Sequence, residues 1–197
     1  MNTRTWIAGL LLLPLSVLAD GFDYTYVEAG FLSSEINAGP FDADGDGIGI
    51  LGSYAIHEEF HLFAGYEDQS FDFGIDSSTL FLGGGINYVL DDDWDLIGRL
   101  SYVSADVDTP VGSADDDGYA LMGGVRGRLT SNVELDAGLN YFDVGDSDTS
   151  LFVNGRYYLN DGLAVGGGLG LNDGDMTLSI TVRAQFGHRN SRGANPD

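Results

Sequence analysis

The chain lacks cysteine and lysine altogether, and positive charge of any kind is scarce. All eight basic residues are Arg, against 31 Asp and Glu, so the formal net charge is −23. Without cysteine there can be no disulfide framework and no thiolate metal site. The acidic balance argues strongly against nucleic-acid binding, which requires a basic face.

Long apolar runs are missing too, except at the very start. Residues 1–4 include one Arg, residues 6–15 are largely apolar, and Val17 and Ala19 supply the small side chains of a cleavage site. We therefore expect residues 1–19 to be a signal peptide that is cleaved near Ala19, and the mature chain to be exported. No later stretch is long enough for a transmembrane helix, so a membrane crossing would have to use strands.

The chain is rich in glycine, in aromatic residues and in alternating segments. Its 30 Gly and 12% aromatic residues favour an all-β protein. We predict a single antiparallel up-and-down transmembrane β-barrel over residues 20–187, with a polar tail over residues 188–197. About ten strands are expected, with eight as the alternative. Turn signals place them at 22–33, 44–56, 60–72, 77–90, 95–107, 117–129, 133–145, 150–159, 163–171 and 175–187.

One phase of this alternation is apolar and free of charge within the segments. A lipid-facing Arg at mid-depth would cost about 2–4 kcal/mol, so a charge-free row is expected on the outside of a membrane barrel. Strands that run alternately up and down would place aromatic residues of this row at two heights, as two girdles at the lipid–water boundaries. The predicted girdle residues are Tyr54, Tyr66, Tyr88, Tyr102, Tyr119, Tyr141, Tyr157 and Phe186.

The opposite phase carries charge, including five of the eight Arg. Because Arg can hold a carboxylate through two parallel hydrogen bonds, we expect a network that plugs and stiffens the lumen. The functional alternative is an ion-selective constriction in a narrow pore. The predicted lumen residues are Glu28, Glu67, Arg99, Arg126, Arg128, Glu134, Asp136, Arg156 and Arg183.

Acidic residues gather between the predicted segments. Asp91–Asp93 belong to a predicted short turn, whereas the links near Ala38 and Gly112 are expected to be longer acidic loops, which would hold Asp115–Asp117. Asp42, Asp44 and Asp46 reproduce the first half of a calcium loop, with oxygen ligands at alternate positions. The twelfth position is Ser53 where Glu is required, so these residues are a weak metal candidate beside a plain acidic loop.

Catalysis has little support in the sequence. Rim enzymes of barrel type often use His at the outer end, but His57 and His61 fall at a predicted periplasmic turn and His188 falls in the tail. With no Cys, the choice of nucleophiles narrows further. We therefore predict no catalytic residues and no cofactor.

The mature chain resembles the small bacterial outer-membrane β-barrels, the OmpA/OmpX-like group in the broad sense. The resemblance lies in Tyr24-Thr25-Tyr26-Val27-Glu28-Ala29-Gly30, then an Asp-Gly segment over residues 44–47, then Gly52-Ser53-Tyr54-Ala55-Ile56-His57 and Phe60-His61-Leu62-Phe63-Ala64-Gly65-Tyr66. It implies an outer-membrane location and insertion by the barrel assembly machinery. Members commonly end on an aromatic residue, whereas here Phe186 is followed by residues 187–197.

The expected role is therefore that of an integral outer-membrane barrel with a structural or surface-interaction function. The alternatives are a narrow porin-like channel for ions or small solutes and, less favoured, an outer-rim lipid- or peptide-modifying enzyme. The expected partners are outer-membrane lipid and lipopolysaccharide, together with the assembly machinery during insertion.

Overall fold

The structure is a computed structural model that describes residues 22–37 and 42–186. The predicted signal peptide and the tail over 188–197 lie outside these described residues. Within them, no helix is long and apolar enough to cross a membrane.

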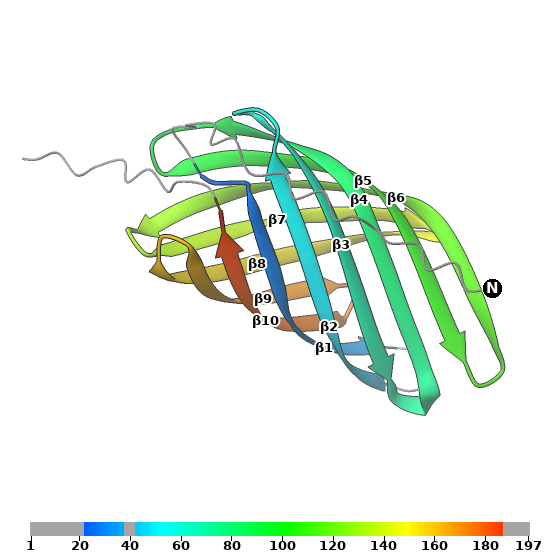
Figure 1. Ribbon diagram of the computed structural model, residues 1–197. Helices are drawn as coiled ribbons and strands as arrows, with labels where there is room; N and C mark the ends of the chain where they lie inside the picture. The colour runs from blue at the N-terminus through cyan, green and yellow to red at the C-terminus, as the bar shows by residue number, and fades with distance from the viewer. Residues whose placement is uncertain (1–21, 38–41, 187–197) are drawn as a thin grey trace, which may run out of the picture.

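The described residues form ten antiparallel strands that close into one barrel (Figure 1). Each strand pairs with its neighbours in sequence, and β1 closes the barrel against β10. The fold prediction is confirmed, with ten strands and not eight. The strands are β1 (Tyr26–Asn37), β2 (Asp42–Ala55), β3 (Phe60–Phe71), β4 (Ile75–Val89), β5 (Trp94–Thr109), β6 (Gly112–Thr130), β7 (Val133–Val144), β8 (Asp146–Asn160), β9 (Leu163–Asn172) and β10 (Asp175–Gln185); the short 3-10 helix η1 (Asp72–Gly74) links β3 to β4.

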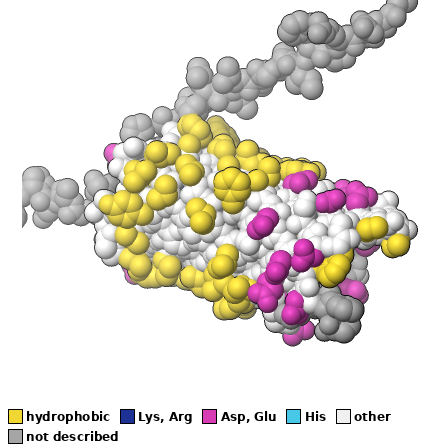
Figure 2. Space-filling model, turned by 90° about the horizontal axis from the view of Figure 1, so that it is seen from below, with side chains coloured by type: hydrophobic (Ala, Val, Ile, Leu, Met, Phe, Trp, Pro, Cys, Tyr) yellow, Lys and Arg dark blue, Asp and Glu magenta, His cyan; other side chains and the backbone are white. Residues whose placement is uncertain are grey.

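The barrel is apolar outside and charged inside. On β10, the outward Ile180 is 73% exposed, whereas Arg183, in the opposite phase, is 3% exposed. Alternating exposure is also seen over the apolar parts of β2, β3 and β8, because successive side chains of a strand point to opposite faces. Figure 2 shows hydrophobic side chains over much of the wall, with acidic side chains gathered toward one end. A soluble barrel would reverse this distribution.

The two ends of the barrel differ, and we name them by the chain termini. At the proximal end the start of β1 and the end of β10 meet, and the Phe186 amide donates a hydrogen bond to the Thr25 carbonyl at 3.0 Å. The distal end carries the opposite set of turns. These include Gly145, whose φ of 70° lies in the left-handed region that glycine adopts readily.

The first predicted strand begins too early. The strand starts at Tyr26, and residues 22–25 bend into the proximal end of the lumen, where Phe22 and Tyr24 are buried. Their alternation with polar residues is that of a strand. However, Arg126 and Asp95 inside the barrel provide partners that a place in the wall would not.

The predicted long loop near Gly112 is wrong. β5 and β6 continue to a tight turn in which Thr109 pairs with Gly112, and Asp115–Asp117 lie within β6. Strand pairing is made by the backbone, so it can continue where both faces meet water and no apolar side chain is needed. The apolar pattern therefore marks where the hydrophobic band ends, which is not where the strand ends.

Glycines on the lumen side make room for long side chains from neighbouring strands. A Cβ at Gly85 would lie 2.2 Å from His61 Nε2 and 3.0 Å from Arg99 Cγ. The next residue, Gly84, faces outward, and a Cβ there would meet nothing closer than 3.8 Å.

This pair gives a direct test of lumen packing. We expect Gly85→Val to lower the free energy of unfolding by about 1–3 kcal/mol, the usual penalty of overpacking. Gly84→Val, its neighbour on the lipid side, is expected to change that free energy little. Urea unfolding in lipid vesicles measures both, and equal losses would show that Gly85 does not provide this space.

Candidate functional site

A line of alternating charges occupies the proximal half of the lumen. Arg126 on β6 is 2% exposed and its Nη2 donates to Glu134 of β7 at 2.7 Å. Its Nε lies 3.7 Å from Asp136 Oδ1, two residues further along β7. The Tyr158 hydroxyl of β8 also donates to Glu134, at 3.0 Å. Glu134, 1% exposed, is thus neutralised and hydrogen-bonded at once, as a buried carboxylate requires.

The line continues across the lumen to the strands that close the barrel. Arg156 of β8 forms an ion pair with Asp136 and another with Glu28 of β1, the latter at 3.2 Å. Arg183 of β10 forms an ion pair with the same Glu28. Because β8 and β1 are separated by two strands, the Arg156–Glu28 pair spans the interior and does not follow the wall. Cations and anions therefore alternate without a break from Glu134 to Arg183.

The chain segment before β1 covers this network at the proximal end. The Tyr24 hydroxyl donates to Asp95 at 3.0 Å, and Arg126 Nη1 donates to the carbonyl of Asp23 at 3.2 Å. Phe22 lies against Arg126, whose Cζ is 4.8 Å from the centre of the ring. Burial raises the pKa of Tyr24, so its hydroxyl remains a donor to Asp95. The segment is therefore fixed both by hydrogen bonds and by cation–π contacts.

Arg99 and Arg128 belong to the same region but do not pair with carboxylates among the described residues. Arg99 donates to His61 Nε2 at 3.2 Å and to the Tyr26 hydroxyl at 3.0 Å. Arg128 stacks on Phe22, with its Cζ 5.1 Å from the ring centre. Both Arg side chains thus contact neutral or aromatic groups, whereas the sequence analysis expected them to pair with carboxylates.

His61 was misplaced by sequence reasoning. It is fully buried inside the barrel, stacked on Tyr24 with 4.8 Å between the ring centres, and is not part of the turn before β3. The signal was present, because His61 adjoins the outward Leu62 and so shares the inward phase of Phe63. The same phase identifies other lumen residues that the prediction omitted, among them Tyr26, Asp95 and Tyr158.

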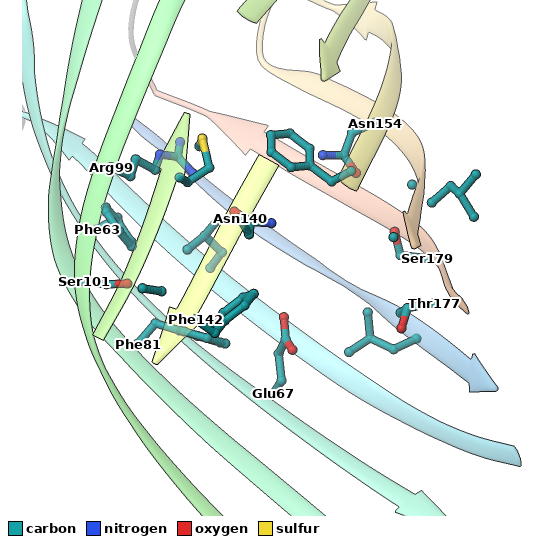
Figure 3. Close-up of a pocket in the computed structure, with 18 residues that line it drawn as sticks. Phe63, Glu67, Phe81, Arg99, Ser101, Asn140, Phe142, Asn154, Thr177 and Ser179 are labelled. Atoms are coloured by element: carbon teal, nitrogen blue, oxygen red, sulfur yellow. The ribbon is translucent and has the colours of Figure 1, made fainter. Parts of the chain in front are cut away.

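Among the described residues, a smaller and a larger cavity interrupt the filling of the lumen. The smaller, about 140 Å³, lies within the ion-pair network and is bordered by Glu28, Arg99 and Arg156. The larger, about 360 Å³, lies on the distal side of the network (Figure 3). Glu67 is beside this larger cavity, apart from the ion-pair line. The predicted lumen residues therefore divide into a proximal network and one separate carboxylate.

No known protein family and no curated protein matches this chain. Among solved structures, the β domain of the Bordetella autotransporter BrkA matches with a TM-score of 0.52 and 15% identity, over 82% of this chain and 99% of that one. The fold is that of a small outer-membrane β-barrel. Two further outer-membrane proteins match less closely. They are Neisserial surface protein A (TM-score 0.44, 19% identity, 82% and 96% covered) and the N-terminal barrel of Pseudomonas aeruginosa OprF (0.46, 13%, 84% and 100%).

The calcium-loop prediction is wrong in its geometry. Asp42, Asp44 and Asp46 lie in β2, with exposed side chains on the outward face. Side chains two apart in a strand are separated by about 7 Å and point the same way, so they do not converge on one ion. The described residues contain no cluster of metal-ligating side chains. The intervening Gly45 and Gly47 face the lumen, where Phe71 and Gln69 lie against them.

The predicted girdle residues all lie on the outward face of the barrel. All are exposed there except Tyr141, which is half-buried. On the distal side, Tyr102 pairs with Tyr119, whose ring centre is 6.2 Å from that of Tyr141. Several of these hydroxyls are held by acids beyond the apolar band. Tyr102 donates to Asp117 at 2.6 Å and Tyr66 donates to Asp68 at 3.1 Å. The distal ring thus joins an apolar zone to an acidic one, while its position in a membrane stays a prediction.

Proposed function

We propose that this protein is an integral outer-membrane barrel with a structural or surface-interaction role, closed at its proximal end. The observation that carries the proposal is the unbroken line of ion pairs across the lumen, covered by residues 22–25. The three Arg and three carboxylates of this line neutralise one another and are held in place, so the line itself offers a passing ion no unpaired charge. The lumen then serves as a stiff core for a barrel whose outer surface meets lipid and, at the distal end, other molecules.

A narrow ion channel is the second candidate. It is favoured by the cavity of about 140 Å³ within the network, which shows that the charged side chains do not fill the proximal lumen completely. If that space joined the larger cavity and the proximal end, the Arg side chains would form a charged constriction.

Conductance separates the two candidates. We expect the folded barrel, reconstituted in a planar lipid bilayer, to show no stable unit conductance, because the network and residues 22–25 block the lumen. The measurement is a single-channel recording of the unmodified barrel beside the Arg126→Ala variant. A stable unit conductance in the unmodified barrel that changes in the variant would establish the channel and rule out the proposal that the lumen is plugged.

The location and the partners follow from the two faces of the barrel. We propose export to the outer membrane, with the proximal end toward the periplasm and the acidic distal end outside. The apolar wall is proposed to contact lipid and lipopolysaccharide. Its contact with lipid is tested by the Ile180→Arg variant, whose folding into lipid vesicles is measured. Insertion is proposed to use the barrel assembly machinery, which depletion of that machinery tests.

We propose further that the barrel is not an enzyme. Of the described His, His57 lies at a proximal turn, where its Nδ1 accepts a hydrogen bond from the Glu59 amide, and His61 is stacked inside the lumen. Neither is near the distal rim, where a lipid or peptide substrate would arrive. Mass spectrometry of lipid A and of peptides after incubation with the barrel tests this proposal.

A further inference from the structure

The distal half of the lumen contains a cavity with the dimensions of a small-molecule site. Its volume of about 360 Å³ falls within the range of ligand pockets, and it is not enclosed. Aromatic side chains form much of its lining, which includes Phe63, Phe81, Phe142 and Phe152. Short polar side chains complete the lining, among them Ser101, Asn140 and Ser179 (Figure 3). Such a mixture suits a ligand with an apolar body and a few polar groups.

Glu67 is the acidic residue of this lining. It stands on β3 opposite Gly49, and its Cγ lies 3.3 Å from the point where a Cβ of residue 49 would be. The missing side chain at Gly49 therefore gives Glu67 room beside the wall, and Figure 3 shows its carboxylate extending toward the cavity. None of the ion pairs among the described residues includes Glu67. A carboxylate in apolar surroundings is stabilised by a cation, and no cation of the described residues lies within ion-pair distance of Glu67.

The Arg of the cavity floor is already engaged. Arg99 donates to His61 and Tyr26, and its Cζ lies 5.2 Å from the centre of the Phe63 ring. These contacts occupy Nε and Nη2 of Arg99, so an anionic ligand would compete with them for the guanidinium, whereas a cationic ligand would meet an acid outside the ion pairs and the negative faces of several rings. The cavity is thus electrostatically suited to a cation.

We propose that this cavity binds a small organic cation, namely an ammonium group carried on an aromatic or aliphatic body. The ammonium pairs with Glu67, and the body packs among the Phe side chains. This function is independent of the plug, since the cavity lies on the distal side of the network and can be filled whether or not the lumen conducts.

Three probes of nearly the same shape test the sign of the charge. We expect phenethylamine to bind the folded full-length barrel in detergent, as measured by isothermal titration calorimetry. Phenethyl alcohol and hydrocinnamate are expected to bind at least about tenfold more weakly, because neither supplies a cation to Glu67. Matched titrations into protein-free micelles correct for partition into detergent.

A pair of variants locates the effect. Glu67→Gln keeps the shape of the side chain and is expected to weaken phenethylamine binding about tenfold while leaving the weak binding of the alcohol unchanged. Asp68→Asn removes the neighbouring acid on the outward face and is expected to have no effect. Heat-modifiable migration in electrophoresis confirms that each variant is folded.

Any of the following results would overturn the proposal. The first is equal affinity for the amine and the alcohol. The second is tighter binding of hydrocinnamate, which would make Arg99 the determinant. The third is no detectable binding of phenethylamine, or binding that Glu67→Gln leaves unchanged.

Discussion

Replacing Arg126 by Ala is expected to lower the free energy of unfolding by about 3–5 kcal/mol, the usual effect of removing one partner of a buried ion pair. Arg126 is the main cation beside Glu134, and it also bonds the carbonyl of Asp23 and stacks on Phe22. Without it, a nearly inaccessible carboxylate loses its charge partner and residues 22–25 lose their anchor. Equilibrium unfolding by urea in lipid vesicles measures the loss.

Arg128→Ala is the matched control. Arg128 lies two residues further along the same face of β6 and stacks on the same Phe22, but it forms no ion pair among the described residues. Its removal should therefore destabilise the barrel much less. A double variant, Arg126→Met with Glu134→Leu, is expected to recover part of the stability because no unpaired charge remains. Equal losses in Arg126→Ala and Arg128→Ala would mean that the ion pair contributes nothing beyond packing.

Replacing Ile180 by Arg is expected to make folding into lipid vesicles less favourable by about 2–4 kcal/mol. Ile180 is 73% exposed on the outward face of β10 and pairs with Phe31 of β1 and with Gly167 of β9, all within the apolar band. A guanidinium there would have to enter hydrocarbon or distort the bilayer to reach water. Folding yield across a urea series in vesicles measures the change.

Ser179→Arg, at the preceding residue, is the control for the Ile180 substitution. Ser179 borders the distal cavity, so the new Arg would enter the lumen. The expected loss is small, since the cavity has space and Glu67 is close to it. If the two substitutions destabilised the barrel equally, the outward face would not be the face that meets lipid.

The sequence predicted the wall of this barrel well for a specific physical reason. Alternation decides which side chains share a face, and a charge-free face opposite a charged one has few explanations other than a membrane barrel. Ten strands and their order could therefore be predicted. The predicted extents failed at both ends of the strands. Residues 22–25 leave the wall, whereas the acidic segment 112–116, predicted as part of a loop, belongs to β6.

The contents of the lumen were predictable only in part. Arg126 and Glu134 lie on neighbouring strands, so a hairpin register suffices to bring them close. Arg156 and Glu28 are 128 residues apart in sequence and meet only because the barrel closes and is narrow. No local pattern indicates that contact. The roles of His61 and Asp95 depended similarly on the bend before β1, which alternation does not reveal.

The inward bend of residues 22–25 also constrains the order of assembly. Tyr24 and the Asp23 carbonyl bind side chains on β5 and β6, 71 and 103 residues away. These partners point toward the barrel axis, so they face one another only once the sheet has curled into a cylinder. These contacts can therefore form only in the closed barrel. Covering the proximal end of the lumen with residues 22–25 thus requires that β1 and β10 have already met.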